Sequence, residues 1–119
     1  MTVLAQCSAA QGTVWVEVCR YDDLPPERGV AVLVGAEQVA LFRLADGSLA
    51  AVSNLDPFSA AYVLARGIVG SRGATPTIAS PMYKQVFDLR SGRCLDDADV
   101  VLRVYPARVH AGRVLLGAP

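Results

Sequence analysis

Residues 80–92, Ser-Pro-Met-Tyr-Lys-Gln-Val-Phe-Asp-Leu-Arg-Ser-Gly, carry the strongest indication of fold in this chain. Pro81 cannot donate a backbone hydrogen bond, so the stretch begins as a loop. From Gln85 to Leu89 the sequence favours a strand. The dipeptide Ser91-Gly92 then favours a tight turn, because glycine adopts left-handed backbone angles at low cost. A second short strand is predicted at Arg93 to Leu95, so the stretch forms a loop followed by a hairpin.

The rest of the chain also favours strands over helices. Val14 to Cys19 alternates in sidedness, and Asp46-Gly47 is a strong turn signal between two strand-forming runs. One short helix is predicted from Ser59, whose hydroxyl suits a helix N-cap, to about Leu64. Residues 67–76, with three glycines and a proline, are predicted to form a loop. Further strands are predicted at Val30 to Val34, Gln38 to Leu44, Ser48 to Ser53, Thr77 to Ala79, Val101 to Val109 and Arg113 to Leu116. About nine or ten short antiparallel strands with one short helix predict an all-β fold, a small sandwich or barrel.

Length and composition indicate a single domain. The chain has 119 residues, of which 53% are hydrophobic, enough for one buried core. We place the domain at residues 14–117 and predict that residues 1–13 form a flexible tail. Basic and acidic residues balance, 11 against 11, so neither a nucleic-acid partner nor an anionic membrane surface is indicated. No apolar run is long enough to predict a transmembrane helix.

The N-terminus and the cysteines favour a cytoplasmic protein. Neither a basic start nor an apolar run precedes Cys7, so a secretory signal is not predicted. Cys7, Cys19 and Cys94 are an odd number at wide spacing, which argues against a disulfide framework. A reducing compartment is the simplest interpretation. We therefore expect Cys19 and Cys94 to pack as small apolar residues.

The stretch quoted first resembles the second ligand loop of Rieske iron–sulfur proteins, without its ligands. That loop reads Cys-Pro-x-His-Gly and continues into a strand with Phe-Asp and a Ser/Thr-Gly turn. Ser80 therefore stands at the cysteine position and Tyr83 at the histidine position. The first Rieske loop, typically Asn-x-Cys-Pro-His, resembles residues 54–58, with Asp56 at the cysteine and Phe58 at the histidine. All four ligand positions are substituted in loops that otherwise keep their outline, so the resemblance implies a Rieske-like fold.

Residue counts argue against an iron–sulfur centre of this type within the chain. A Rieske centre takes two cysteines and two histidines. The chain has one histidine, His110, far in sequence from both loops, and three cysteines, too few for a four-cysteine cluster. The cysteines and His110 also lack the close spacing of a structural zinc site. Ser80 has no histidine near it in sequence, which argues against a nucleophilic triad. We therefore predict neither metal ligands nor catalytic residues, and no cofactor in this chain.

Two uses of the substituted positions are open. Phe58 and Tyr83 are large enough to fill the space of a cluster, while Asp56 and Ser80 can hydrogen-bond backbone groups of the opposing loop. Such a packed loop pair is favoured over any catalytic use. In the second use, the tip of the loops, with a modest positive patch, docks a partner protein. The predicted docking residues are Asp56, Phe58, Arg66, Arg72, Tyr83 and Lys84.

Two blocks of sequence, residues 56–70 and 79–97, carry a closer resemblance. They resemble the small subunit of assimilatory NADH-dependent nitrite reductase, a family with the Rieske fold and without the cluster ligands. The Tyr-Lys-Gln that follows Ser-Pro is part of that family's signature, and the likeness runs from about residue 14 to 116. The resemblance implies an accessory, non-catalytic subunit. It implies as partner a large subunit with FAD, a [4Fe–4S] cluster and sirohaem, which reduces nitrite to ammonium with NADH.

Two other functions remain open on the residues alone. A stand-alone, non-redox domain on the same scaffold would bind a small anion or another protein. The segment Gly70-Ser71-Arg72-Gly73 supports phosphate binding only weakly, because the Walker spacing and a following helix are missing. A redox ferredoxin is disfavoured by the ligand count. The accessory subunit is therefore the leading hypothesis.

Overall fold

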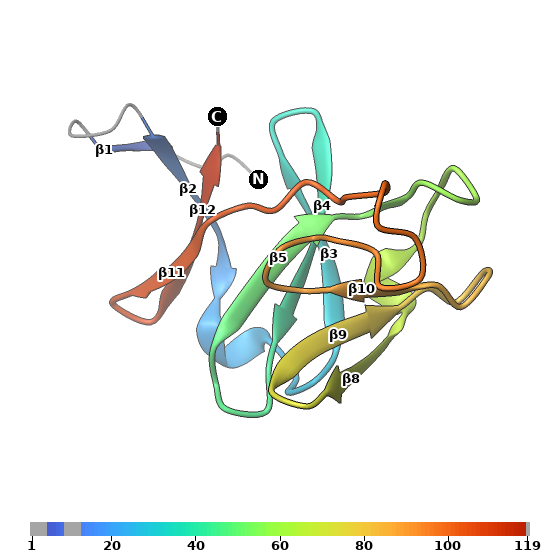
Figure 1. Cartoon of the computed structure of the whole chain (residues 1–119). Helices are drawn as coiled ribbons and strands as arrows, with labels where there is room; N and C mark the ends of the chain where they lie inside the picture. Colours follow the sequence, from blue (N-terminus) through green and yellow to red (C-terminus); the bar gives the residue numbers. More distant parts are fainter. Residues whose placement is uncertain (1–4, 9–12, 119) are drawn as a thin grey trace.

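The computed structural model describes residues 5–8 and 13–118, which form an all-β domain as predicted (Figure 1). Within these described residues, twelve strands make three main sheets and one small hairpin, and all the pairings between these strands are antiparallel. The first sheet contains, in order, β1 (Ala5–Ser8), β2 (Thr13–Arg20), β12 (Arg113–Ala118) and β11 (Ala107–His110). The second contains β3 (Gly29–Val34), β4 (Glu37–Arg43) and β5 (Leu49–Ser53), and the third β10 (Val86–Asp88), β9 (Thr75–Ala79) and β8 (Ile68–Arg72). The hairpin pairs β6 (Leu55–Asp56) with β7 (Ala61–Tyr62).

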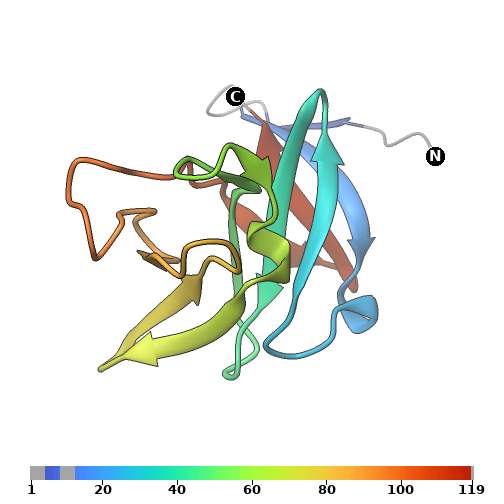
Figure 2. The same cartoon turned by 90° about the vertical axis from the view of Figure 1, so that its right-hand side faces the viewer.

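The second sheet lies between the other two and forms the centre of the domain (Figures 1 and 2). Residues 39–42 of β4, Val-Ala-Leu-Phe, are a continuous apolar run with 0% exposure. Successive strand side chains point to opposite faces of a sheet, so this run serves two cores. Two of its side chains join the core with β2 and β12, and the other two join the core with β9 and β10. A strand buried on both faces explains why β4 does not alternate between apolar and polar residues.

The helix predicted from Ser59 to Leu64 is wrong. Residues 57–60 form a turn, Ala61–Tyr62 forms β7, and the only helical turn here is the 3₁₀ segment Leu64–Arg66. The Ser59 hydroxyl accepts a hydrogen bond from the Ala61 N–H at 3.3 Å, and Ala60 has a φ of 60°. Side chains of this kind compete with the helix for backbone donors, and a left-handed residue ends helical propagation.

The loop predicted over residues 67–76 is also wrong in large part. Residues 68–72 form β8, which pairs along its whole length with β9, and only residues 73–74 form the turn between them. Gly73 has a φ of 61° and is the one glycine in this stretch with a left-handed backbone. Gly67 and Gly70 do not have positive φ angles, so these two glycines do not mark a loop.

The strand predicted at residues 93–95 is reduced to isolated bridges from Cys94 to Phe87 and from Arg93 to Val101. Of the strand predicted at residues 101–109, only the last part forms a strand, as β11.

The tail predicted over residues 1–13 falls partly on residues 1–4 and 9–12, outside the described part, while residues 5–8 pair with β2 as β1. None of the helical segments among the described residues is long and apolar enough to span a membrane.

Tyr105 anchors the segment between β10 and β11 to the second sheet. Its backbone N–H donates to the carbonyl of Ala51 at 2.9 Å, and its side chain is only 4% exposed. The Tyr105 hydroxyl donates to the Glu37 carboxylate, which also forms an ion pair with Arg103 at 3.1 Å. Burial and the hydrogen bond and charge of Glu37 raise the pKa of Tyr105 to about 12.

Tyr105→Phe is therefore expected to remove part of the loss of stability at high pH. In the wild type the unfolded chain releases the phenol proton near pH 10, while the folded protein holds it to about pH 12. The stabilisation is complete below pH 10 and is lost as pH rises to 12, by about 2 kcal/mol. Urea unfolding of both proteins at pH 9 and pH 11.5 measures this difference. An equal loss of unfolding free energy in the two proteins between pH 9 and pH 11.5 would contradict the raised pKa of Tyr105.

Candidate functional site

The two loops that resemble Rieske ligand loops lie side by side at one end of the domain. Residues 55–62 and 80–85 are at the right of Figure 1 and face the viewer in Figure 2. The Ser80 hydroxyl donates to Oδ2 of Asp56 at 2.5 Å, and the two residues are 1% and 0% exposed. The side chains at the two former cysteine positions thus join the loops directly.

Each of these side chains also organises its own loop. Oδ1 of Asp56 accepts a hydrogen bond from the Phe58 N–H at 2.9 Å, and the Ser80 hydroxyl accepts one from the Met82 N–H at 3.2 Å. The sequence had suggested bonds from Asp56 and Ser80 to backbone groups of the opposing loop. The structure instead shows a side-chain bond between loops and backbone bonds within each loop.

Asn54 is a supporting residue that lies outside the predicted site. It is 2% exposed, accepts a hydrogen bond from the Ala65 N–H at 2.8 Å and donates to the side chain of Gln38 at 3.2 Å. These contacts tie the start of the first loop to the 3₁₀ turn and to β4. The asparagine of the Asn-x-Cys-Pro-His pattern was the available signal.

The aromatic residues at the former histidine positions behave differently. Phe58 is half-buried and packs on Phe87, with ring centroids 6.1 Å apart and an angle of 47° between the planes. Phe58 therefore fills interior space. Tyr83 is 60% exposed, so the expectation that it also fills this space is wrong.

The predicted docking residues do not all lie on one accessible surface. Asp56 is fully buried and Phe58 is half-buried, so neither carboxylate nor ring is freely available to a partner. Arg72 is exposed, but it pairs with Thr75 at the far end of β8 from the loops. Of the predicted docking residues, Arg66, Tyr83 and Lys84 are exposed near the loop pair.

The residues at the former ligand positions do not fit a [2Fe–2S] cluster. Asp56 and Ser80 are hydrogen-bonded to each other, Phe58 offers no ligating atom, and a tyrosine replaces the second histidine. Within the described residues, no three side chains of His, Cys, Asp or Glu gather in a way that could hold a metal ion. His110 lies in β11 of the first sheet, remote from Ser80, so the two do not form a nucleophilic pair.

The cysteines of the described part that were expected to pack as apolar residues are placed in or near the core. Cys94 is 1% exposed and belongs to the core that also contains Phe87. Cys19 is half-buried in β2, where burial and the charge of Asp23 raise the pKa of its thiol. The raised pKa of Cys19 disfavours its reactive thiolate, and burial keeps the Cys94 thiol away from reagents in solution.

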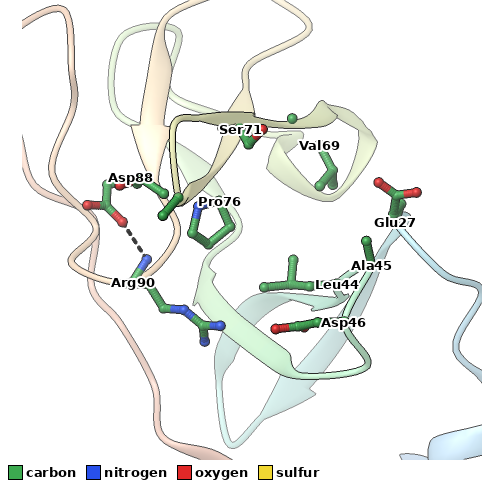
Figure 3. Close-up of a pocket in the computed structure, with 12 residues that line it drawn as sticks. Glu27, Leu44, Ala45, Asp46, Val69, Ser71, Pro76, Asp88 and Arg90 are labelled. Atoms are coloured by element: carbon green, nitrogen blue, oxygen red, sulfur yellow. Dashed lines mark hydrogen bonds between the residues drawn. The ribbon is translucent and has the colours of Figure 1, made fainter.

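A cleft of about 420 Å³ lies at the other end of the third sheet, between the β4–β5 turn and the β8–β9 hairpin (Figure 3). Arg90 at its edge donates to the Ser48 hydroxyl at 3.0 Å, and its backbone N–H donates to Asp88 at 2.7 Å. Hydrogen bonds from Ser48 lower the pKa of Asp46. The cleft contains none of the predicted docking residues, although Gly70 and Ser71 of the candidate phosphate-binding segment line it.

Comparisons with known proteins identify the family and the fold. Residues 14–117 match the family described as the Rieske-like [2Fe-2S] domain. The chain is 42% identical over 103 residues to the nitrite reductase (NADH) small subunit of Escherichia coli K12, covering 86% of this chain and 95% of that one. A crystal structure of an NADH-dependent nitrite reductase small subunit from Mycobacterium tuberculosis is 53% identical, with a TM-score of 0.87, covering 90% and 96% of the two chains.

One relative places the same domain inside a much larger protein. The chain is 40% identical over 103 residues to the nitrite reductase [NAD(P)H] large subunit of Klebsiella oxytoca. The match covers 87% of this chain but only 11% of that protein. The shared fold, the substituted ligand positions and the relatives agree: the chain belongs to the Rieske-like domain family and, within it, to the small subunits of NADH-dependent nitrite reductase.

Proposed function

We propose that the chain is an accessory, non-catalytic subunit of an assimilatory nitrite reductase that converts nitrite to ammonium with NADH in the cytoplasm. Its partner is a large subunit that carries FAD, a [4Fe–4S] cluster and sirohaem. The observation that supports this role most directly is the Asp56–Ser80 hydrogen bond at the two former cysteine positions. A loop pair closed in this way has no group that accepts an electron, so electron transfer belongs to the partner.

The Klebsiella oxytoca relative supports the choice of partner. A domain 40% identical to this chain is part of a protein described as the large subunit. Two polypeptides that are joined in one organism often associate when they are separate in another. The chain would then contribute stability, assembly or gating to the large subunit.

The experiment that tests this function is affinity purification of the tagged chain from its own cells grown on nitrite. We expect a large protein with flavin and sirohaem absorbance to elute with the colourless chain, and NADH-dependent nitrite consumption to follow the complex. The isolated chain should not oxidise NADH with nitrite. A chain that elutes alone from cells that still reduce nitrite with NADH would contradict the proposal and favour a stand-alone binding domain.

A further inference from the structure

Exposed apolar side chains gather around the loop pair. Met82 and Tyr83 are 50% and 60% exposed, and Ile68 is 75% exposed. Ile68 pairs with Ala79, the residue just before Ser80, so it lies beside the base of the second loop. Pro57 and Ala60 of the first loop are exposed as well. We call Pro57, Ala60, Ile68, Met82 and Tyr83 the loop-pair surface.

The backbone under this surface is held in place by hydrogen bonds. The Ser80 N–H donates to the carbonyl of Gln85 at 2.9 Å, and the Lys84 N–H donates to the carbonyl of Ser80 at 3.1 Å. In the first loop the Ala60 N–H donates to the carbonyl of Asp56 at 2.8 Å. A surface with a fixed backbone loses less conformational entropy on binding than a mobile loop does.

Both loops also contain a strained residue. Lys84 and Ala60 have φ angles of 64° and 60°, although neither is glycine. The left-handed conformation costs about 1–2 kcal/mol for a residue with a Cβ atom. Such strain is concentrated at binding and catalytic sites, where the surrounding structure maintains it.

The exposed charges within the two loops and the adjoining 3₁₀ turn are basic, and acidic residues lie at the margin. Between Ser48 and Phe87 the only acidic residue is Asp56, which is buried. Arg66 and Lys84 are exposed near the apolar residues. The acidic segment 96–99 reaches the margin, where Asp96 accepts a hydrogen bond from the backbone of β10. An apolar centre with Arg66 and Lys84 beside it suits a protein partner that presents an apolar depression with acidic neighbours.

We propose that the loop-pair surface is the face through which this chain binds the large subunit. This inference rests on the function proposed above. The occupant is the large subunit because, in the Klebsiella oxytoca protein, the matching domain is part of that same polypeptide. The ends of the matched domain lie in β2 and β12 of the first sheet, on the other side of the molecule (Figure 1). A covalent connection through these ends therefore leaves the loop-pair surface free to contact the rest of the large subunit.

The test uses the full chain and the purified large subunit. Met82→Ser combined with Tyr83→Ser should weaken binding at least tenfold, because exposed aromatic and methionine side chains supply much of the free energy at such interfaces. The matched control is Val109→Ser, which removes an exposed apolar side chain from β11 in the first sheet. This control should bind within about twofold of the wild type. Ile68→Ser provides a second loop-pair variant if the double variant does not fold.

The possible results test the proposed binding surface and the proposed function separately. Binding of the loop-pair variants at wild-type affinity, or equal weakening by the control, would overturn the surface while leaving the proposed function in place. Failure of the wild-type chain to bind the large subunit would overturn both. A wild-type dimer that the double variant abolishes in size-exclusion chromatography would show that a second copy of the chain occupies the surface.

Discussion

Replacing Asp56 by alanine is expected to lower the free energy of unfolding by about 3 kcal/mol. The carboxylate is fully buried and accepts hydrogen bonds from the Ser80 hydroxyl at 2.5 Å and the Phe58 N–H at 2.9 Å. In the Asp56→Ala variant the buried Ser80 hydroxyl and the part-buried Phe58 N–H both lose this acceptor. A buried donor that loses its acceptor costs about 1–3 kcal/mol. Urea unfolding followed by far-UV circular dichroism measures the change.

Asp46→Ala is the matched control for this prediction. Asp46 also accepts a backbone N–H and a serine hydroxyl, both from Ser48, but it is exposed. Water replaces the lost acceptor at an exposed site, so the cost should stay below about 1 kcal/mol. Equal destabilisation by Asp46→Ala and Asp56→Ala would show that burial of the loop contact is not the cause.

The bond between the loops can be isolated with a second pair of variants. Ser80→Ala leaves the Asp56 carboxylate buried with one donor fewer, and the double variant removes both partners. The coupling free energy between the two substitutions should be about 1–2 kcal/mol. Additive effects would show that each residue stabilises only its own loop, through the Phe58 and Met82 N–H groups.

The fold was predictable because its strands carry local signals. The hairpin of β3 and β4 and the strand β5 lie within one or two residues of their predicted bounds, since turn residues separate runs of strand-forming residues. The strand β8 was missed because Gly67, Gly70 and Gly73 suggested a loop. Pairing with the full length of β9 overrides the weak strand preference of glycine.

The site was predictable as a set of positions but not as a surface. The motif located Asp56 and Ser80, and the residue counts argued against a cluster. Sequence spacing cannot show which side chains turn inward, so Asp56 was proposed as a docking residue although it is fully buried. Ile68 and Met82 belong to no recognised motif, and it is their exposure in the folded chain that indicates a binding surface.

Gly92→Ala is expected to lower the free energy of unfolding by about 4 kcal/mol, which combines two costs. Gly92 has a φ of 81°, a conformation that costs a residue with a Cβ atom about 1–2 kcal/mol. A Cβ atom there would also lie 2.2 Å from the carbonyl oxygen of Leu102 and 3.0 Å from a methyl group of Val104. That oxygen is backbone, so relief requires the two segments to separate, and overpacking of this kind costs about 1–3 kcal/mol.

The control for this prediction is Gly73→Ala, which separates the two costs. Gly73 has a φ of 61°, and a Cβ atom there meets no other atom within 4 Å. Gly73→Ala should therefore show only the backbone cost of about 1–2 kcal/mol. The Leu102 N–H donates to the Gly92 carbonyl at 2.7 Å, so the contact that excludes the Cβ atom also holds the returning segment on the turn. Equal stability of the two variants would show that the chain yields at Leu102, and that the turn needs glycine for its backbone angle alone.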